Sequence, residues 1–214
     1  MKAWISKSIS KPWRKYKSKL ADILHPLVHI GSAIPLLVGL WDFWQGNLGA
    51  DPILEITHRS GKTAITLLIL TLSITPLRQI LKWSQVNKLR RPLGLWSAFY
   101  VLIHFTIYVA LDFGFMWKLL LDNSLKHWFV LLGLTAGIIL LVLAITSLNF
   151  FLRKMGKNWK KLHRLIYLVG ILVAIHFILA VKPGVLLPWP YVAILAFLLA
   201  FRLQPVQDWV KKTF

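Results

Sequence analysis

Six long runs of apolar residues, separated by short polar segments, limit what this chain can fold into. They cover residues 23–44, 61–77, 93–113, 127–148, 163–181 and 189–203. A helix rises about 1.5 Å per residue, so about 20 residues cross a hydrocarbon core of about 30 Å. The second and sixth runs are shorter and would have to extend into their flanks or tilt. The runs predict an all-α polytopic membrane protein, a bundle of six transmembrane helices.

The composition agrees with a protein that lies almost entirely in a membrane. Of the 214 residues, 57% are apolar and only 15% are charged, which is far from the average of soluble domains. We predict a basic cytoplasmic tail at residues 1–20, one six-helix membrane domain at 21–205 and a cytoplasmic tail at 206–214. The sequence shows no internal repeat and no separate soluble domain beside the six runs.

The cations predict the orientation of the helices. If the N-terminus is cytoplasmic, 21 of the 26 Lys and Arg residues fall on the cytoplasmic side, as the positive-inside rule expects. Both termini are then cytoplasmic. The formal net charge of +19 does not indicate a nucleic-acid partner, because the cations lie in the gaps between apolar runs rather than on one basic face. The pattern instead predicts a protein that is surrounded by membrane lipid.

The chain contains no cysteine. This excludes disulfides, thiolate catalysis, thiolate-held iron–sulfur clusters and cysteine-based zinc sites. Histidine is then the main ligand available to a haem or a transition metal.

Two histidines, His104 and His176, lie deep within apolar runs. They follow the predicted inner ends of the third and fifth helices by twelve and thirteen residues, so both lie about 18 to 20 Å from that face. A polar ring at such depth is costly unless it has a partner. Two rings at matched depth on helices of the same direction predict axial ligands of a haem iron. The alternative is a pair of buried histidines satisfied by a carbonyl or by a hydroxyl such as that of Thr106 or Ser97.

A second pair of histidines lies near the inner face. His163 adjoins Lys161 and Arg164, and it is either an interfacial residue or a ligand of a second, inner haem. Its partner would come from the start of the first helix, where His25 and His29 lie one turn apart. His29 is deeper and is the better candidate.

Other chemistry is sparse. His58 and His127 are expected at the outer interface, and His58 could also approach the propionates of an outer haem or a partner protein. There is no glycine-rich nucleotide loop. The acidic residues are too few and too peripheral for a carboxylate dyad or an intramembrane proton path.

An ordered set of motifs resembles the MsrQ family, formerly YedZ, of bacterial membrane proteins. The motifs extend from the end of the first run to the start of the sixth. They are Gly49-Ala50-Asp51-Pro52, His58 with Gly61, Leu72-Ser73-Ile74-Thr75-Pro76-Leu77-Arg78, Arg90-Arg91-Pro92-Leu93-Gly94-Leu95, His104 with Tyr108, and Leu162-His163-Arg164-Leu165-Ile166-Tyr167-Leu168 continuing through His176 to Lys182.

The resemblance implies a ferric-reductase-like transmembrane domain in the bacterial inner membrane, with b-type haem and with FMN as a further cofactor. Members of this family pass electrons from the quinone pool or the cytoplasmic side to MsrP, a periplasmic molybdopterin subunit that reduces methionine sulfoxide in oxidised proteins. The important histidines of the family correspond to His104, His163 and His176. The sequence does not indicate where FMN would bind.

We therefore expect a membrane electron-transfer subunit with one or two b haems, which is not itself the catalyst of sulfoxide reduction. The donor would be a quinol or a separate cytoplasmic flavin reductase. One alternative is a stand-alone transmembrane cytochrome that reduces ferric iron or oxygen. The other is a non-redox transporter or structural subunit.

Overall fold

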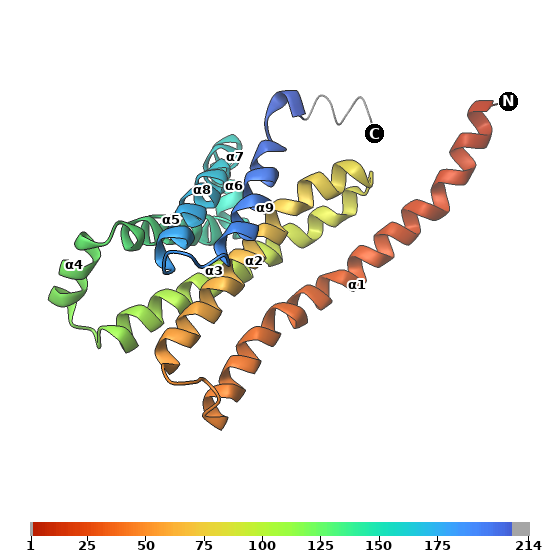
Figure 1. The fold of residues 1–214 in the computed structure, drawn as a ribbon. Helices are drawn as coiled ribbons and strands as arrows, with labels where there is room; N and C mark the ends of the chain where they lie inside the picture. The colour runs from red at the N-terminus through yellow and green to blue at the C-terminus, as the bar shows by residue number, and fades with distance from the viewer. Residues whose placement is uncertain (1, 207–214) are drawn as a thin grey trace.

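Helix α1 (Lys2–Gln45) is the longest element and lies along one side of the other helices (Figure 1). The computed structural model describes the backbone of residues 2–206 and the side chains of residues 19–206. Of the predicted tail at 206–214 only Val206 is described, and of the predicted tail at 1–20 only the side chains of Lys19 and Leu20 are. The apolar part of α1, Lys19–Gln45, has 27 residues, enough to cross a bilayer. Its exposed apolar side chains, such as Ile30 and Leu37, suit a helix that is solvated by lipid.

Helices α2 (Pro52–Ile80) and α3 (Arg90–Ile107) form a tightly packed pair joined through η1 (Ser84–Leu89). The Asp51 carboxylate caps α2 by accepting a hydrogen bond of 3.0 Å from the Leu54 amide, which satisfies one of the unpaired donors of the first turn. Within the pair, the fully buried Ser97 hydroxyl donates to the Ala64 carbonyl at 2.9 Å. Small residues at this contact let the two backbones approach closely.

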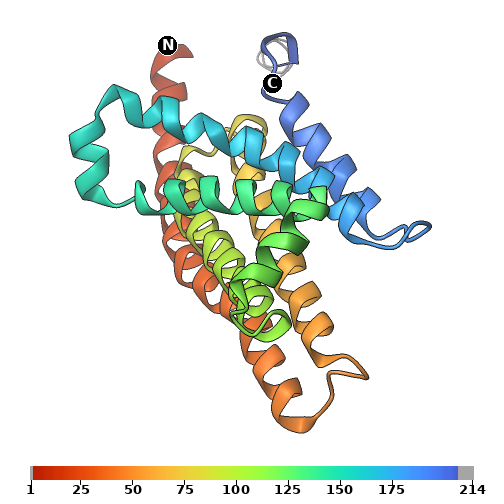
Figure 2. The same ribbon diagram turned by 90° about the vertical axis from the view of Figure 1, so that its left-hand side faces the viewer.

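The second half of the chain forms another helix pair, α5 with α8. Figure 2 shows these two helices side by side, running across the α2–α3 pair. The elements in order are η2 (Tyr108–Asp112), α4 (Trp117–Lys126), α5 (Trp128–Ile145), α6 (Asn149–Met155), α7 (Lys157–Leu162), η3 (His163–Leu165), α8 (Ile166–Ala180) and α9 (Pro188–Ala200).

The main core lies where the two helix pairs and α9 meet. Its fully or almost fully buried members include Leu68 and Leu72 of α2, Leu140 of α5, Val169 of α8 and Leu195 of α9. This aliphatic contact sets how far α3 stands from α8. It therefore also sets how closely side chains one or two turns further along these helices can approach.

The predicted all-α, multi-pass membrane fold is confirmed. Within the described residues, five helices are long and apolar enough to cross a bilayer. The apolar run predicted at 61–77 lies within α2, which has 29 residues. The helix therefore extends well beyond the apolar run. The sixth run forms α9, which has only 13 residues and at about 1.5 Å per residue spans about 20 Å.

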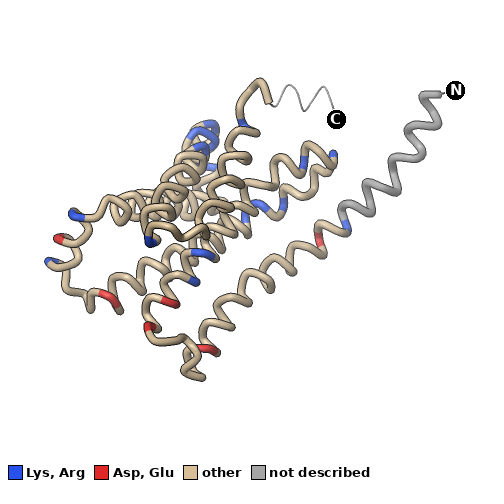
Figure 3. The backbone as a smooth tube through the Cα atoms, in the orientation of Figure 1, with Lys and Arg blue, Asp and Glu red and all other residues tan. Residues whose placement is uncertain are grey.

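Charged residues gather at the helix ends. Figure 3 shows Lys and Arg concentrated at the end of the molecule that carries η1, α6 and α7. Most acidic residues lie toward the opposite end, including Asp42, Asp51 and Glu55 around the turn between α1 and α2. The cytoplasmic placement of both termini stays a prediction from the positive-inside rule.

Candidate functional site

The structure brings His104 of α3 and His176 of α8 together. Their ring centroids lie 6.4 Å apart and the ring planes stand at 88° to one another. Both side chains are partly buried. Because the residues are 72 positions apart in the sequence and lie on different helix pairs, tertiary packing alone creates this contact.

Each ring is held by one backbone carbonyl. Nδ1 of His104 lies 3.0 Å from the Thr57 carbonyl oxygen on α2, and Nδ1 of His176 lies 2.7 Å from the Phe129 carbonyl oxygen on α5. A carbonyl can only accept, so in both rings Nδ1 carries the hydrogen and donates it. Nε2 of each neutral ring then keeps a free lone pair. This is the tautomer that metal-binding histidines adopt when a carbonyl orients them.

Two glycines lie directly against the rings. A Cβ atom added to Gly133 would stand 2.7 Å from both Cε1 and Nδ1 of His176. A Cβ atom added to Gly61 would stand 3.2 Å from Cε1 and 3.3 Å from Nδ1 of His104. The rings therefore occupy space that any side chain at these two positions would fill.

The chemistry of the pair fits a haem iron, which histidine nitrogen binds. Imidazole nitrogen binds such metals at about 2 Å, so two bonds plus the distances from nitrogen to ring centre give a centroid separation of roughly 6 Å. The described residues contain no group of three or more His, Asp or Glu side chains that could hold a metal ion. Two imidazoles on their own suit an iron whose other four ligands belong to a macrocycle.

The inner pair, His163 and His29, has a different arrangement. Nε2 of His163 lies 3.1 Å from the Thr146 hydroxyl, and its ring stacks on Trp159 at 3.9 Å and 26°. Because that hydroxyl already donates to the Val142 carbonyl at 2.7 Å, Nε2 of His163 must donate to it. The nitrogen that would face a metal is thereby occupied.

His29 lies on α1 beside α3. Its Nδ1 accepts a hydrogen bond of 3.0 Å from the Trp96 indole, and its ring centroid is 5.2 Å from that of His25. Among the described ring and hydrogen-bond contacts, those of His29 come from α1 and α3. Those of His163 come from Thr146, directly after α5, and from α7. In this arrangement the structure does not bring the two inner histidines together.

The remaining histidines are exposed. His58 lies on α2 and His127 directly precedes α5, where its ring centroid is 5.6 Å from that of Phe129. The sequence reasoning missed the carbonyls of Thr57 and Phe129, because backbone groups leave no signal in the residue types. It also missed the role of Gly61 and Gly133. A usable signal existed, since each glycine precedes its histidine by 43 positions.

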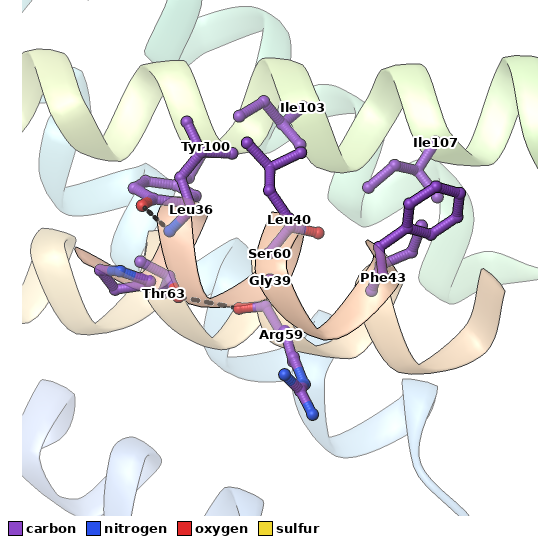
Figure 4. Close-up of a pocket in the computed structure, with 12 residues that line it drawn as sticks. Leu36, Gly39, Leu40, Phe43, Arg59, Ser60, Thr63, Tyr100, Ile103 and Ile107 are labelled. Carbon is purple, nitrogen blue, oxygen red and sulfur yellow. Dashed lines mark hydrogen bonds between the residues drawn. The ribbon is translucent and has the colours of Figure 1, made fainter. Parts of the chain in front are cut away.

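An apolar pocket of about 300 Å³ lies beside His104, between α1, α2 and α3 (Figure 4). Ser60 lines it, and the Ser60 hydroxyl is 3.4 Å from Nδ1 of His104. The polar residues in its lining all bond to groups of the protein itself; they are Arg59, Ser60, Thr63 and Tyr100. The pocket therefore offers a polar ligand little that is not already engaged.

Comparison with known proteins identifies the family. The family model described as a ferric reductase like transmembrane component matches residues 60–175. The chain is 41% identical over 182 residues to the protein-methionine-sulfoxide reductase heme-binding subunit MsrQ of Xanthomonas axonopodis pv. citri (strain 306), covering 82% of this chain and 84% of the relative. It is 38% identical over 185 residues to the subunit of the same name from Salmonella arizonae, covering 85% of this chain and 92% of the relative.

No solved structure matches the chain. The matched region of the family model contains His104 and ends one residue before His176. Long apolar helices, the transmembrane family model and relatives matched over most of their length agree with one another. The chain therefore belongs to the MsrQ family of multi-pass bacterial membrane proteins with a ferric-reductase-like transmembrane domain.

Proposed function

We propose that this chain is a haem b electron-transfer subunit of a protein-methionine-sulfoxide reductase system. Its relatives carry the name of a heme-binding subunit of such a reductase. The observation that carries the proposal is the pair of His104 and His176, 6.4 Å apart, each with Nδ1 directed at a carbonyl. Two neutral imidazoles this close, each with a free Nε2 lone pair, are suited to a haem iron.

His104 and His176 would hold the haem, which would supply reversible one-electron transfer when bound. The carbonyls of Thr57 and Phe129 keep Nδ1 protonated and make Nε2 a stronger donor to a metal. The surrounding apolar helices exclude water and provide a low dielectric. Ligand type, this second layer of hydrogen bonds and burial are the factors by which a protein sets a haem potential.

The partners follow from the family and the charge distribution. Electrons would come from a quinol or from a cytoplasmic flavin reductase at the basic end of the bundle, and leave at the opposite end toward a periplasmic molybdopterin subunit resembling MsrP. That subunit, not this chain, would reduce methionine sulfoxide in oxidised proteins. FMN is a further cofactor implied by the resemblance, and the cations at the basic end are suited to its phosphate. His163 and His29 stay a prediction for a second, inner haem.

The test is the optical spectrum with pyridine haemochrome quantification of the purified protein. Wild type should carry a low-spin b-type haem, and His104→Ala and His176→Ala should each lose the haem held between them. His127→Ala, which changes an exposed histidine directly before α5, is the matched control and should retain it. Full haem content in both His104→Ala and His176→Ala would contradict the assignment. His163→Ala and His29→Ala report on the inner pair in the same assay.

The match to a ferric-reductase-like component favours a second candidate, a stand-alone cytochrome that reduces ferric iron or oxygen. Reduction of ferric chelates or of oxygen by the purified chain without a periplasmic partner would support it. A colourless protein under conditions that supply haem would instead support a transporter or a structural subunit.

A further inference from the structure

The two rings of the candidate site are held by equivalent contacts in the two helix pairs. His104 on α3 donates to the Thr57 carbonyl on α2, and His176 on α8 donates to the Phe129 carbonyl on α5. In each case the two bonded residues are 47 positions apart. In each case, too, the fourth residue after the carbonyl is the glycine that touches the ring.

The correspondence extends along both helix pairs. A shift of 72 positions aligns the two carbonyls, the two glycines and the two histidines. It also aligns Gly-x-Thr-Ala at 61–64 with 133–136, and Val-x-Ile-His-Phe at 101–105 with 173–177. The α2–α3 and α5–α8 pairs thus share one pattern of residues and ring contacts. This correspondence was not singled out from the sequence, and the contacts of the two rings make it visible.

The spacing of four residues has a physical reason. In a helix the carbonyl of one residue points along the axis toward the residue four positions later, whose side chain covers it. A carbonyl oxygen has a second lone pair beyond the one used in the helix. When the fourth residue is glycine, that lone pair is open to a donor from a neighbouring helix. Gly61 and Gly133 each uncover the carbonyl that orients a histidine.

We propose that Gly61 and Gly133 are positioning residues of the haem site, which set the approach and the orientation of His104 and His176 by exposing one helical carbonyl to each ring. This inference rests on the proposed haem-binding function. The atoms nearest to an added Cβ at either glycine belong to a histidine ring, so the role concerns the ring and not the contact between helix backbones.

The two positions differ in how much space they leave. At Gly133 an added Cβ would stand 2.7 Å from two ring atoms of His176, so the ring must leave its place against the Phe129 carbonyl. At Gly61 the same atom would stand 3.2 Å from the His104 ring, which a shift of a few tenths of an ångström relieves. Alanine should therefore disturb the site strongly at Gly133 and weakly at Gly61.

The experiment measures haem affinity and spin state of the purified full chain, by titrating the haem-depleted protein in detergent with hemin. Gly133→Ala should lower the affinity about 10-fold or more, the usual effect of losing a group that orients a metal-binding histidine. It should also convert part of the ferric low-spin spectrum to high spin. Gly61→Ala should change both less. The control is Gly94→Ala on α3, where a Cβ would lie 3.6 Å from Thr71, an ordinary contact.

A double variant separates positioning from general misfolding. In a His176→Ala background the ring that Gly133→Ala displaces is gone, so adding Gly133→Ala should change neither the yield nor the residual haem affinity. If Gly133→Ala alone does not accumulate, the double variant still tests the inference, because it should accumulate as well as His176→Ala. Equal harm from Gly133→Ala with and without the His176 ring would overturn the inference.

The outcomes also separate the inference from the proposed function. Wild type that binds no haem removes both. Wild type that binds low-spin haem, with Gly133→Ala indistinguishable from it or with Gly94→Ala equally damaging, removes only the role of the glycines.

Discussion

The hydroxyl of Tyr100 on α3 donates a hydrogen bond of 2.7 Å to the carbonyl of Ser32 on α1. The same hydroxyl accepts one of 3.0 Å from the Leu36 amide, four residues later. It thus lies within the hydrogen-bond ladder of α1, between a donor and an acceptor that would otherwise bond each other. Ser32 and Tyr100 are both buried, so this insertion anchors the long and otherwise loosely packed α1 to the α2–α3 pair.

Tyr100→Phe should loosen α1 without removing the ring packing. Interhelical hydrogen bonds in membrane proteins contribute about 0.6 kcal/mol on average and up to about 1.7 kcal/mol, so the midpoint of thermal unfolding in detergent should fall modestly. Tyr191→Phe is the control, because its ring also packs against a neighbour but no described hydrogen bond involves its hydroxyl. An unchanged midpoint in Tyr100→Phe, or an equal fall in the control, would argue against the anchor.

The perpendicular rings of His104 and His176, at 88°, predict the magnetic signature of a bound haem. Their two carbonyl bonds fix the ring orientations. Perpendicular axial imidazoles bring the two iron orbitals that interact with them close in energy, which produces a highly anisotropic low-spin ferric signal. Electron paramagnetic resonance of the oxidised protein should show this signal.

A rhombic signal typical of parallel imidazoles would contradict that orientation. The control is His176→Gly supplied with free imidazole, because the free ring is no longer tethered to α8. Its signal should differ from that of wild type even where haem content is restored.

The Arg59 guanidinium bonds to two carboxylates, Asp42 of α1 and Glu55 of α2. The bond to Asp42 joins two different helices near the turn between them. The Arg59 and Asp42 side chains are 34% and 21% exposed, whereas those of Lys88 and Asp22, which form another interhelical pair, are 50% and 59% exposed. Salt screens exposed pairs more than partly buried ones.

Asp42→Asn should therefore destabilise the protein more than Asp22→Asn, with both effects on the order of 1 kcal/mol or less. Thermal unfolding in detergent at low and at high salt measures this. High salt should erase most of the Asp22→Asn effect and less of the Asp42→Asn effect. The reverse ranking would mean that Arg59 is held by Glu55 and that the link to α1 is dispensable.

The sequence alone predicted most of the architecture and the two central residues of the candidate site. The apolar runs and the distribution of cations determine a multi-pass helical membrane protein, because an unpaired backbone cannot exist in lipid and helix length must match bilayer thickness. The spacing of His104 and His176 from the ends of their runs indicates a shared depth, because helical rise is constant. The lack of cysteine leaves histidine as the main candidate ligand of the proposed haem.

Which faces meet was decided only by tertiary structure. Helical rise fixes depth but not rotation or neighbours, so His29 and His163, plausible partners by depth, have their contacts on different helices. The bonds of the two rings to the Thr57 and Phe129 carbonyls, and the close approach of the His176 ring to Gly133, likewise emerge only when α2, α3, α5 and α8 pack on one aliphatic core. Many sets of distances are compatible with the same depths, and close packing selects one of them. Those distances determine which nitrogen of each histidine lies against a backbone carbonyl.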